Sequence, residues 1–257
     1  MSAPLLTTQG LGKSFGGLKA IDAIDLQARP GSLLSVIGPN GAGKTTLFNC
    51  LTGIYRPDRG RVEFDGRNIT GLAPHKACHL GIARTFQNIR LFPEMSALEN
   101  ILVGQFHHTT LAPWDILLRT PRFRRCRAAH LEEAHEWLAL VGMEGQGETP
   151  ARDLAYGMQR RLEIARALAT RPRVLLLDEP CAGMNPSEVN GIIELISTLR
   201  RRDLAILLIE HHMKVVMEIS DRVLVLDHGV MLAEGEPASI RANPDVIRAY
   251  LGGGNLI

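Results

Sequence analysis

The residues Gly38-Pro39-Asn40-Gly41-Ala42-Gly43-Lys44-Thr45 form the pattern GxxxxGK[ST], which is typical of a phosphate-binding loop. Glycines let the backbone curl so that successive N–H groups point at one anion. Lys44 is placed to reach the β- and γ-phosphates of a nucleotide, and the Thr45 hydroxyl is placed to bind Mg²⁺. We therefore predict a nucleoside triphosphate site, with contacts from Gly38, Asn40, Gly41, Ala42, Gly43, Lys44, Thr45 and Thr46.

A second pair of chemically capable residues, Asp178 and Glu179, ends the apolar run at 174–177. Two adjacent acids at the end of a buried strand are costly unless a cation or a water uses them. The carboxyl edge of an open parallel sheet is also where ligands bind. Asp178 suits Mg²⁺, and Glu179 suits the polarisation of a water that attacks the γ-phosphate. An ordinary surface acid pair is the alternative, which the phosphate loop in the same chain disfavours.

Apolar patterns indicate the elements that position these groups. Runs at 33–37, 174–177 and 205–209 have the composition of strands buried on both faces of a parallel sheet. A helix at about 44–53 follows the loop, and a helix from about Glu188 joins two of the strands as a βαβ crossover. Other regions are predicted as short strands within 5–37, a hairpin at 61–66, mainly helices over 75–155 and a last strand at 222–227. The fold class is α/β.

Composition excludes several classes of protein. The net charge is +2, from 29 Lys and Arg against 27 Asp and Glu, so the overall charge gives no general attraction to nucleic acid. The 45% hydrophobic content predicts an ordered core. The longest clean apolar run, 204–209, is too short to span a membrane, and Thr7, Thr8 and Gln9 interrupt any signal-peptide pattern. The four cysteines are far apart, which predicts reduced thiols rather than a zinc site.

Five segments occur in an order and spacing that resemble the nucleotide-binding subunit of an ATP-binding cassette (ABC) transporter. They are the phosphate loop, 84–88 (RTFQN), 154–161 (LAYGMQRR), the strand end Asp178-Glu179-Pro180, and His211. The resemblance covers nearly the whole chain. It implies a P-loop NTPase core with a small antiparallel β subdomain at 1–86 and 160–235. It also implies an inserted α-helical subdomain at 87–159 and a C-terminal tail at 236–257.

The resemblance assigns roles to three further residues. Phe15 lies where an aromatic ring of the family stacks on adenine. Gln87 matches the glutamine that touches Mg²⁺ and the attacking water. His211, rather than the adjacent His212, matches the histidine that contacts the γ-phosphate.

The signature segment departs from the usual LSGGQ of the family. Gly157 retains the second glycine, but Ala155 replaces the serine whose hydroxyl would contact the γ-phosphate, and Met158 replaces glutamine. A helix from Gln159 to Thr170 still offers its N-terminal amides to an anion, so we expect weaker ATP-driven dimer closure but not its loss. Asn185 ends the D-loop, where the family usually has aspartate.

In this family the signature of one subunit faces the phosphate loop of another. The resemblance therefore implies a dimer, with a second copy or a sister ATPase subunit, that holds two ATP and Mg²⁺. Lys44 and Mg²⁺ would act on the phosphates and Glu179 on the water. The implied partners are integral-membrane permease subunits and, indirectly, a periplasmic solute-binding protein, without nucleic acid. The implied location is peripheral, at the cytoplasmic face of the inner membrane.

The Tyr156-Gly157 form of the signature and the tail at 243–252 resemble an ATPase subunit of branched-chain amino acid importers. Other cargo (urea, amides, other amino acids), an exporter, and a soluble non-transport ATPase remain alternatives. A basic stretch comprises Arg119, Arg122, Arg124, Arg125 and Arg127. It is interpreted as a solvated face or as a contact for anionic lipid or a permease; as a nucleic-acid signal it is weak.

Overall fold

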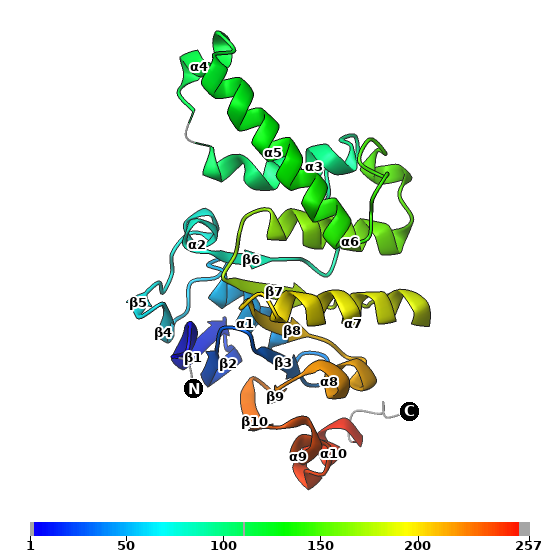
Figure 1. The fold of residues 1–257 in the computed structure, drawn as a ribbon. Helices are drawn as coiled ribbons and strands as arrows, with labels where there is room; N and C mark the ends of the chain where they lie inside the picture. The colour runs from blue at the N-terminus through cyan, green and yellow to red at the C-terminus, as the bar shows by residue number, and fades with distance from the viewer. Residues whose placement is uncertain (1–2, 110, 252–257) are drawn as a thin grey trace.

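The computed structural model describes residues 3–109 and 111–251. A six-stranded sheet with the order β10-β9-β3-β8-β7-β6 forms the centre of the molecule (Figure 1). Its strands are β3 (Leu33–Ile37), β6 (Ile82–Arg84), β7 (Val174–Asp178), β8 (Ala205–Ile209), β9 (Arg222–Asp227) and β10 (Val230–Gly235). All neighbouring pairs are parallel except β10 and β9. The predicted parallel sheet is confirmed.

The connection between β7 and β8 confirms the predicted crossover. Helix α7 (Pro186–Arg200) lies between these two parallel strands in the chain. Every residue of β3, β7 and β8 is buried, which explains why their sequences are runs rather than alternations. The prediction of β9 as the last strand was wrong, because β10 pairs antiparallel with it.

A second, antiparallel sheet has the order β2-β1-β4-β5. Its strands are β1 (Leu6–Phe15), β2 (Leu18–Ala28), β4 (Arg59–Phe64) and β5 (Arg67–Asn68). The predicted hairpin is β4 and β5, with Asp65 and Gly66 at positive φ in its turn. The prediction of short strands within 5–37 was wrong for β1 and β2, which have 10 and 11 residues. Register shifts along their pairing bend this ribbon without ending it.

The helices form two groups. Those of the helical lobe are α3 (Ala97–Gln105), α4 (Pro113–Leu117), α5 (Pro121–Leu140) and α6 (Tyr156–Leu168), with short 3₁₀ turns at Phe106–His108 and Ala151–Asp153. The others are α1 (Lys44–Leu51), α2 (Pro74–Leu80), α7, α8 (Met213–Ile219), α9 (Pro237–Arg241) and α10 (Pro244–Leu251). In Figure 1, α5 extends away from the sheet and carries α4 at its far end. Part of the predicted tail, residues 252–257, lies outside the described residues.

Two hydrophobic clusters lie on opposite faces of the six-stranded sheet. Alternate strand residues, such as Leu175 and Leu176, enter different clusters, as the pleat requires. One cluster joins the sheet to α1 and the antiparallel sheet, and the other joins it to α3, α5, α6 and α7. Among the described residues, no helix combines the length and apolar character of a membrane span. All four cysteines are free thiols.

Candidate nucleotide and hydrolysis site

The phosphate loop connects β3 to α1, as predicted. Gly38 has φ 150°, and a Cβ there would lie 2.1 Å from the carbonyl oxygen of Leu226 at the end of β9. Gly43 has φ 101°, and a Cβ there would lie 2.4 Å from the carbonyl oxygen of Ala20 in β2. Only glycine fits at either position, so neighbouring strands hold the loop from two sides.

Lys44 begins α1 and is almost completely buried. Its Nζ donates to the carbonyl oxygens of Gly38 at 2.7 Å and Pro39 at 2.9 Å, so the ammonium lies over the loop. Burial lowers the pKa of Lys44, while the charges of Glu179 and Asp178 act in the opposite direction. An ammonium group that lies over a phosphate loop is placed to bind the anionic phosphates of a nucleotide.

Gln87, Glu179 and His211 converge at the carboxyl edge of the sheet. Gln87 Nε2 donates to Glu179 Oε2 at 2.9 Å, and His211 Nδ1 lies 3.8 Å from the same oxygen. Glu179 follows β7 with φ 49°, a left-handed conformation that few side chains adopt, and its N–H donates to the carbonyl of Ile209. The three residues come from distant parts of the chain. Together they place an amide and an imidazole beside one carboxylate.

Asp178 ends β7 and forms a buried ion pair with Arg84, the last residue of β6. Arg84 Nη2 lies 2.7 Å from Asp178 Oδ2, and Nη1 donates to Asn49 Oδ1 at 2.6 Å. Thr45 is exposed in the first turn of α1. A carboxylate and a hydroxyl are hard oxygen donors, which suit Mg²⁺. Arg84 was not predicted as a site residue, because its partner Asp178 lies far away in the sequence.

A buried pair on α6 holds the backbone around Gln87. Arg160 and Glu163 are 1% and 2% exposed, and Arg160 Nη1 lies 3.0 Å from Glu163 Oε2. Arg160 also donates to the carbonyls of Phe86, at 2.6 Å, and Gln87. Glu163 Oε1 accepts from the N–H groups of Phe86 and Arg90. Burial raises the pKa of Glu163, and Arg160 opposes this effect. This pair was not predicted.

Glu210 holds the backbone around His211. It is buried after β8, and its Oε2 accepts from the N–H groups of His211 at 3.0 Å and His212 at 3.2 Å. Its Oε1 accepts from the N–H of Cys181 at 2.9 Å. The loops after β7 and β8 are therefore joined through one side chain, a role of Glu210 that was not predicted.

Phe15 lies at the end of β1, in the tight connection to β2. Its ring is 43% exposed and meets Tyr55 edge-on, with centroids 5.1 Å apart, and Lys13 Nζ lies 5.5 Å from its centroid. Because Ala20 of β2 contacts Gly43, this connection lies beside the phosphate loop. Tyr55 was missed, although it is one of only three tyrosines.

The signature segment packs against the start of α7. Helix α6 begins at Tyr156, so the predicted start at Gln159 was wrong; residues 156–158 form its first turn, directly after Ala155. The atoms nearest a Cβ on Gly157 all belong to Glu188, the closest at 2.5 Å. Asn185 caps α7, because its Oδ1 accepts from the N–H groups of Ser187 and Glu188. Ala155, Gly157 and Asn185 thus gather at the N-termini of α6 and α7, whereas Gln87, Glu179 and His211 gather around one carboxylate.

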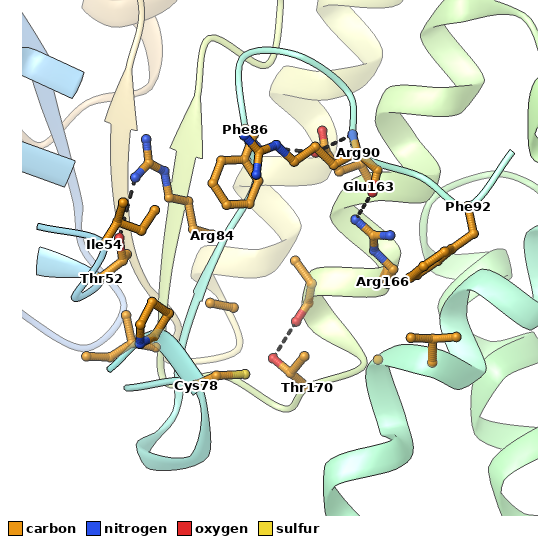
Figure 2. Close-up of a pocket in the computed structure, with 16 residues that line it drawn as sticks. Thr52, Ile54, Cys78, Arg84, Phe86, Arg90, Phe92, Glu163, Arg166 and Thr170 are labelled. Atoms are coloured by element: carbon orange, nitrogen blue, oxygen red, sulfur yellow. Dashed lines mark hydrogen bonds between the residues drawn. The ribbon is translucent and has the colours of Figure 1, made fainter. Parts of the chain in front are cut away.

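A groove of about 440 Å³ separates β6 and α2 from the helical lobe. Figure 2 shows Arg84 and Phe86 on one side and Phe92 and Arg166 on the other. Arg166 Nη2 donates to the carbonyl of Arg90, whose guanidinium lies 4.3 Å from the centroid of Phe86. Arg84 lines this groove and also pairs with Asp178, so its side chain connects the groove to the carboxyl edge of the sheet.

Comparisons with known proteins agree with this geometry. A family model described as "ABC transporter" matches residues 21–182, and one described as "Branched-chain amino acid ATP-binding cassette transporter" matches 230–254. The chain is 51% identical to the high-affinity branched-chain amino acid transport ATP-binding protein BraF of Pseudomonas aeruginosa, over 98% of this chain and 99% of that protein. It is 49% identical to the corresponding protein LivG of Escherichia coli K12, with the same coverage.

Solved structures are similar over almost the same length. A nucleotide-free ATP-binding cassette from an ABC transporter has a TM-score of 0.84 and 31% identity, over 96% of this chain and 99% of that one. An ATP-binding cassette of an ABC transporter in its ADP conformation also has a TM-score of 0.84, with 32% identity over 98% and 100%. The ABC transporter model matches more than half of the chain, and relatives align over nearly all of it. The chain therefore belongs to the ABC transporter family, as an ATP-binding ATPase subunit.

Proposed function

We propose that this subunit hydrolyses ATP to drive uptake of branched-chain amino acids through integral-membrane permease subunits. Gln87 and His211 converge on one carboxylate oxygen of Glu179, which supports hydrolysis at this edge of the sheet. The cargo rests on similarity to BraF and LivG, which are named as branched-chain amino acid transport proteins and align over 98% of the chain.

In this proposal Glu179 accepts a proton from the attacking water, while Gln87 and His211 orient that water and the γ-phosphate. Lys44 and the loop amides from Gly38 to Thr46 bind the phosphates, and Phe15 stacks on adenine with Tyr55 supporting its ring edge. Thr45, Asp178 and Gln87 would hold Mg²⁺, which supplies charge neutralisation at the phosphates. Catalysis of this kind is mostly positioning and charge stabilisation.

The helix N-termini that gather Ala155, Gly157 and Asn185 are proposed to contact ATP held by a second ATPase subunit. The amides of α6 and its dipole replace the missing serine hydroxyl. We further propose the division into a core (1–86 and 160–235), a helical lobe (87–159) and a tail (236–257). Helix α6 runs continuously across the boundary at 159–160, so it would transmit movement of the helical lobe to the core.

The groove beside Arg84 is the proposed contact for a permease segment at the cytoplasmic face of the inner membrane. Ile54, Phe92 and Val103 line it and are between 41% and 44% exposed, which suits an apolar partner surface. A contact there would act on Asp178 through Arg84. A periplasmic solute-binding protein would deliver cargo on the other side of the membrane.

The substitution Glu179→Gln tests the hydrolysis step. It keeps the side-chain shape and its contact with Gln87 but removes the base, so turnover should fall about 10²- to 10⁴-fold while ATP binding persists. Glu194→Gln, an exposed change on α7, is the matched control and should keep full turnover. Unchanged turnover in the Glu179 variant would exclude this residue as the base.

A separate experiment tests the cargo. Uptake of radiolabelled leucine, isoleucine and valine is measured in a strain lacking this subunit and complemented with either form. Wild type should restore uptake and Glu179→Gln should not. Normal uptake in the uncomplemented strain would refute the cargo but leave the hydrolysis proposal intact.

A further inference from the structure

The far end of the helical lobe carries an unusual combination of exposed apolar and basic side chains. We call this region the tip: Phe106, α4 with Leu118 and Arg119, and the first turns of α5 to Arg127. Figure 1 shows α4 at the end of the lobe that is farthest from the six-stranded sheet. Neither the nucleotide site nor the groove uses these residues.

Helix α4 buries its acidic residue and exposes its apolar residues, the reverse of an ordinary surface helix. Its acidic residue, Asp115, is buried, with Oδ1 accepting from Thr120 Oγ1 at 2.8 Å and Oδ2 accepting from the N–H of Ala112 at 3.2 Å. The apolar residues around it face outward: Trp114 is 65% exposed, Leu117 83% and Leu118 71%. Surface helices normally show the opposite arrangement. These exposed side chains contribute little buried apolar area to the folded chain, so we interpret them as a contact surface for an apolar partner.

The tip has a concentrated positive net charge. Residues 106–127, which span the tip, contain five arginines and one acid, a balance of 5 − 1 = +4, whereas the whole chain has 29 − 27 = +2. The single acid is Asp115, which is already engaged by Thr120. Arg119, Arg124 and Arg127 line a cavity of about 420 Å³ whose floor includes Phe123 and Leu131. Its three arginine side chains, rather than its size, make it suited to an anionic phosphate group.

We propose that the tip binds a bilayer surface rich in anionic phospholipids. The arginines bind headgroup phosphates through their planar, multiply donating guanidinium groups, and Trp114, Leu117 and Leu118 enter the boundary between headgroups and acyl chains. Tryptophan is favoured at that boundary because its ring is apolar and its N–H is polar. The combination of basic and apolar groups on one projecting surface matches a fluid anionic membrane in both charge and polarity.

The position of the tip agrees with a membrane-facing orientation. Val103 of α3 lines the groove, α3 ends at Gln105, and Phe106 next to it is 73% exposed. The tip therefore continues from the surface proposed to meet the permease. This orientation rests on the proposed function, but vesicle binding by the full-length subunit alone does not.

Vesicle flotation of the full-length chain tests the proposal. Vesicles of phosphatidylcholine with about 30% phosphatidylglycerol should bind the protein, pure phosphatidylcholine vesicles should bind it much less, and about 0.5 M NaCl should weaken binding. Arg124→Glu/Arg125→Glu should bind anionic vesicles at least about tenfold more weakly. Arg201→Glu/Arg202→Glu, with the same change of charge on exposed residues elsewhere, is the control and should bind like wild type.

The apolar contribution has its own readout. In a Trp137→Phe background, Trp114 is the only tryptophan, and its fluorescence should shift to the blue when anionic vesicles are added. Leu117→Ser/Leu118→Ser should reduce that shift. Each variant should retain wild-type ATP affinity, and Glu179→Gln should float like wild type, which separates this proposal from hydrolysis.

Three results would overturn the proposal. The first is equal binding of wild type to neutral and anionic vesicles. The second is equal weakening by the tip and control charge reversals. The third is vesicle binding unchanged by Arg124→Glu/Arg125→Glu together with lost co-purification of permease subunits, which would identify the tip as a protein contact instead.

Discussion

Replacing Arg160 by methionine removes one half of a buried ion pair and should destabilise the protein strongly. Glu163 would remain 2% exposed without its ion-pair partner, and the carbonyls of Phe86 and Gln87 would lose their donor. Breaking a buried pair in this way costs about 3–5 kcal/mol. For a chain of this size each kcal/mol corresponds to about 2–4 °C, so the Tm should fall by about 6–20 °C.

The double variant Arg160→Met/Glu163→Gln separates the stranded charge from the lost hydrogen bonds. Glutamine keeps an acceptor for the N–H groups of Phe86 and Arg90 but carries no charge. The hydrogen bonds from Arg160 to the two carbonyls and to the Tyr156 hydroxyl are still lost, at about 1–3 kcal/mol in total. The double variant should therefore melt at a higher temperature than the single variant, although below wild type.

Thermal unfolding followed by circular dichroism measures both variants without nucleotide. Arg248→Met is the matched control, because Arg248 pairs with Asp245 at the same i,i+3 spacing but on the surface. That exposed pair should contribute less than about 1 kcal/mol. If the single variant loses no more stability than this control, or the double variant is no more stable than the single one, the reasoning about the buried charge is wrong.

The same substitution should also affect catalysis. The backbone of Gln87 would lose its anchor on α6, so kcat should fall by about 10- to 100-fold, while KM for ATP changes little because the phosphate loop is untouched. A parallel rise in KM would point to general loosening of the nucleotide site. Steady-state ATPase assays below the lower Tm distinguish these outcomes.

Three further changes have expected outcomes. Arg84→Met leaves Asp178 buried without its cation, so Mg²⁺ with ATP should raise the Tm of this variant more than that of wild type; an equal rise would contradict the role of the pair. Burial raises the pKa of Cys50 to about 11 from an ordinary value of 9.0, so as the pH rises the thiol ionises first in the unfolded chain. The free energy of unfolding should therefore fall between about pH 9 and 11. Cys50→Ala should remove this decrease when the Tm is measured as a function of pH. Gly43→Ala places a Cβ 2.4 Å from a β2 carbonyl and should weaken ATP binding at least about tenfold, whereas Gly17→Ala, with no atom within 4 Å, should leave titrated affinity unchanged.

Local sequence was sufficient for the features whose physics is local. Nearly continuous apolar runs predicted β3, β7 and β8, because a strand buried on both faces does not alternate between apolar and polar residues. The phosphate loop and the Asp178-Glu179 strand end were predicted for the same reason, since their chemistry lies within a few consecutive residues. The start of α6 and the lengths of β1 and β2 were not, because packing and bulges decide where such elements begin and end.

The sequence by itself determined which residues could bind phosphate and activate water. Only the tertiary structure decided what holds them. Arg84 lies 94 residues from Asp178, and Arg160 lies 73 residues from Gln87. Nothing in the neighbourhood of either arginine in the chain indicates its partner. A buried charge acquires its partner only when the sheet edge and the helical lobe pack together, because desolvation makes an unpaired charge too costly to remain there.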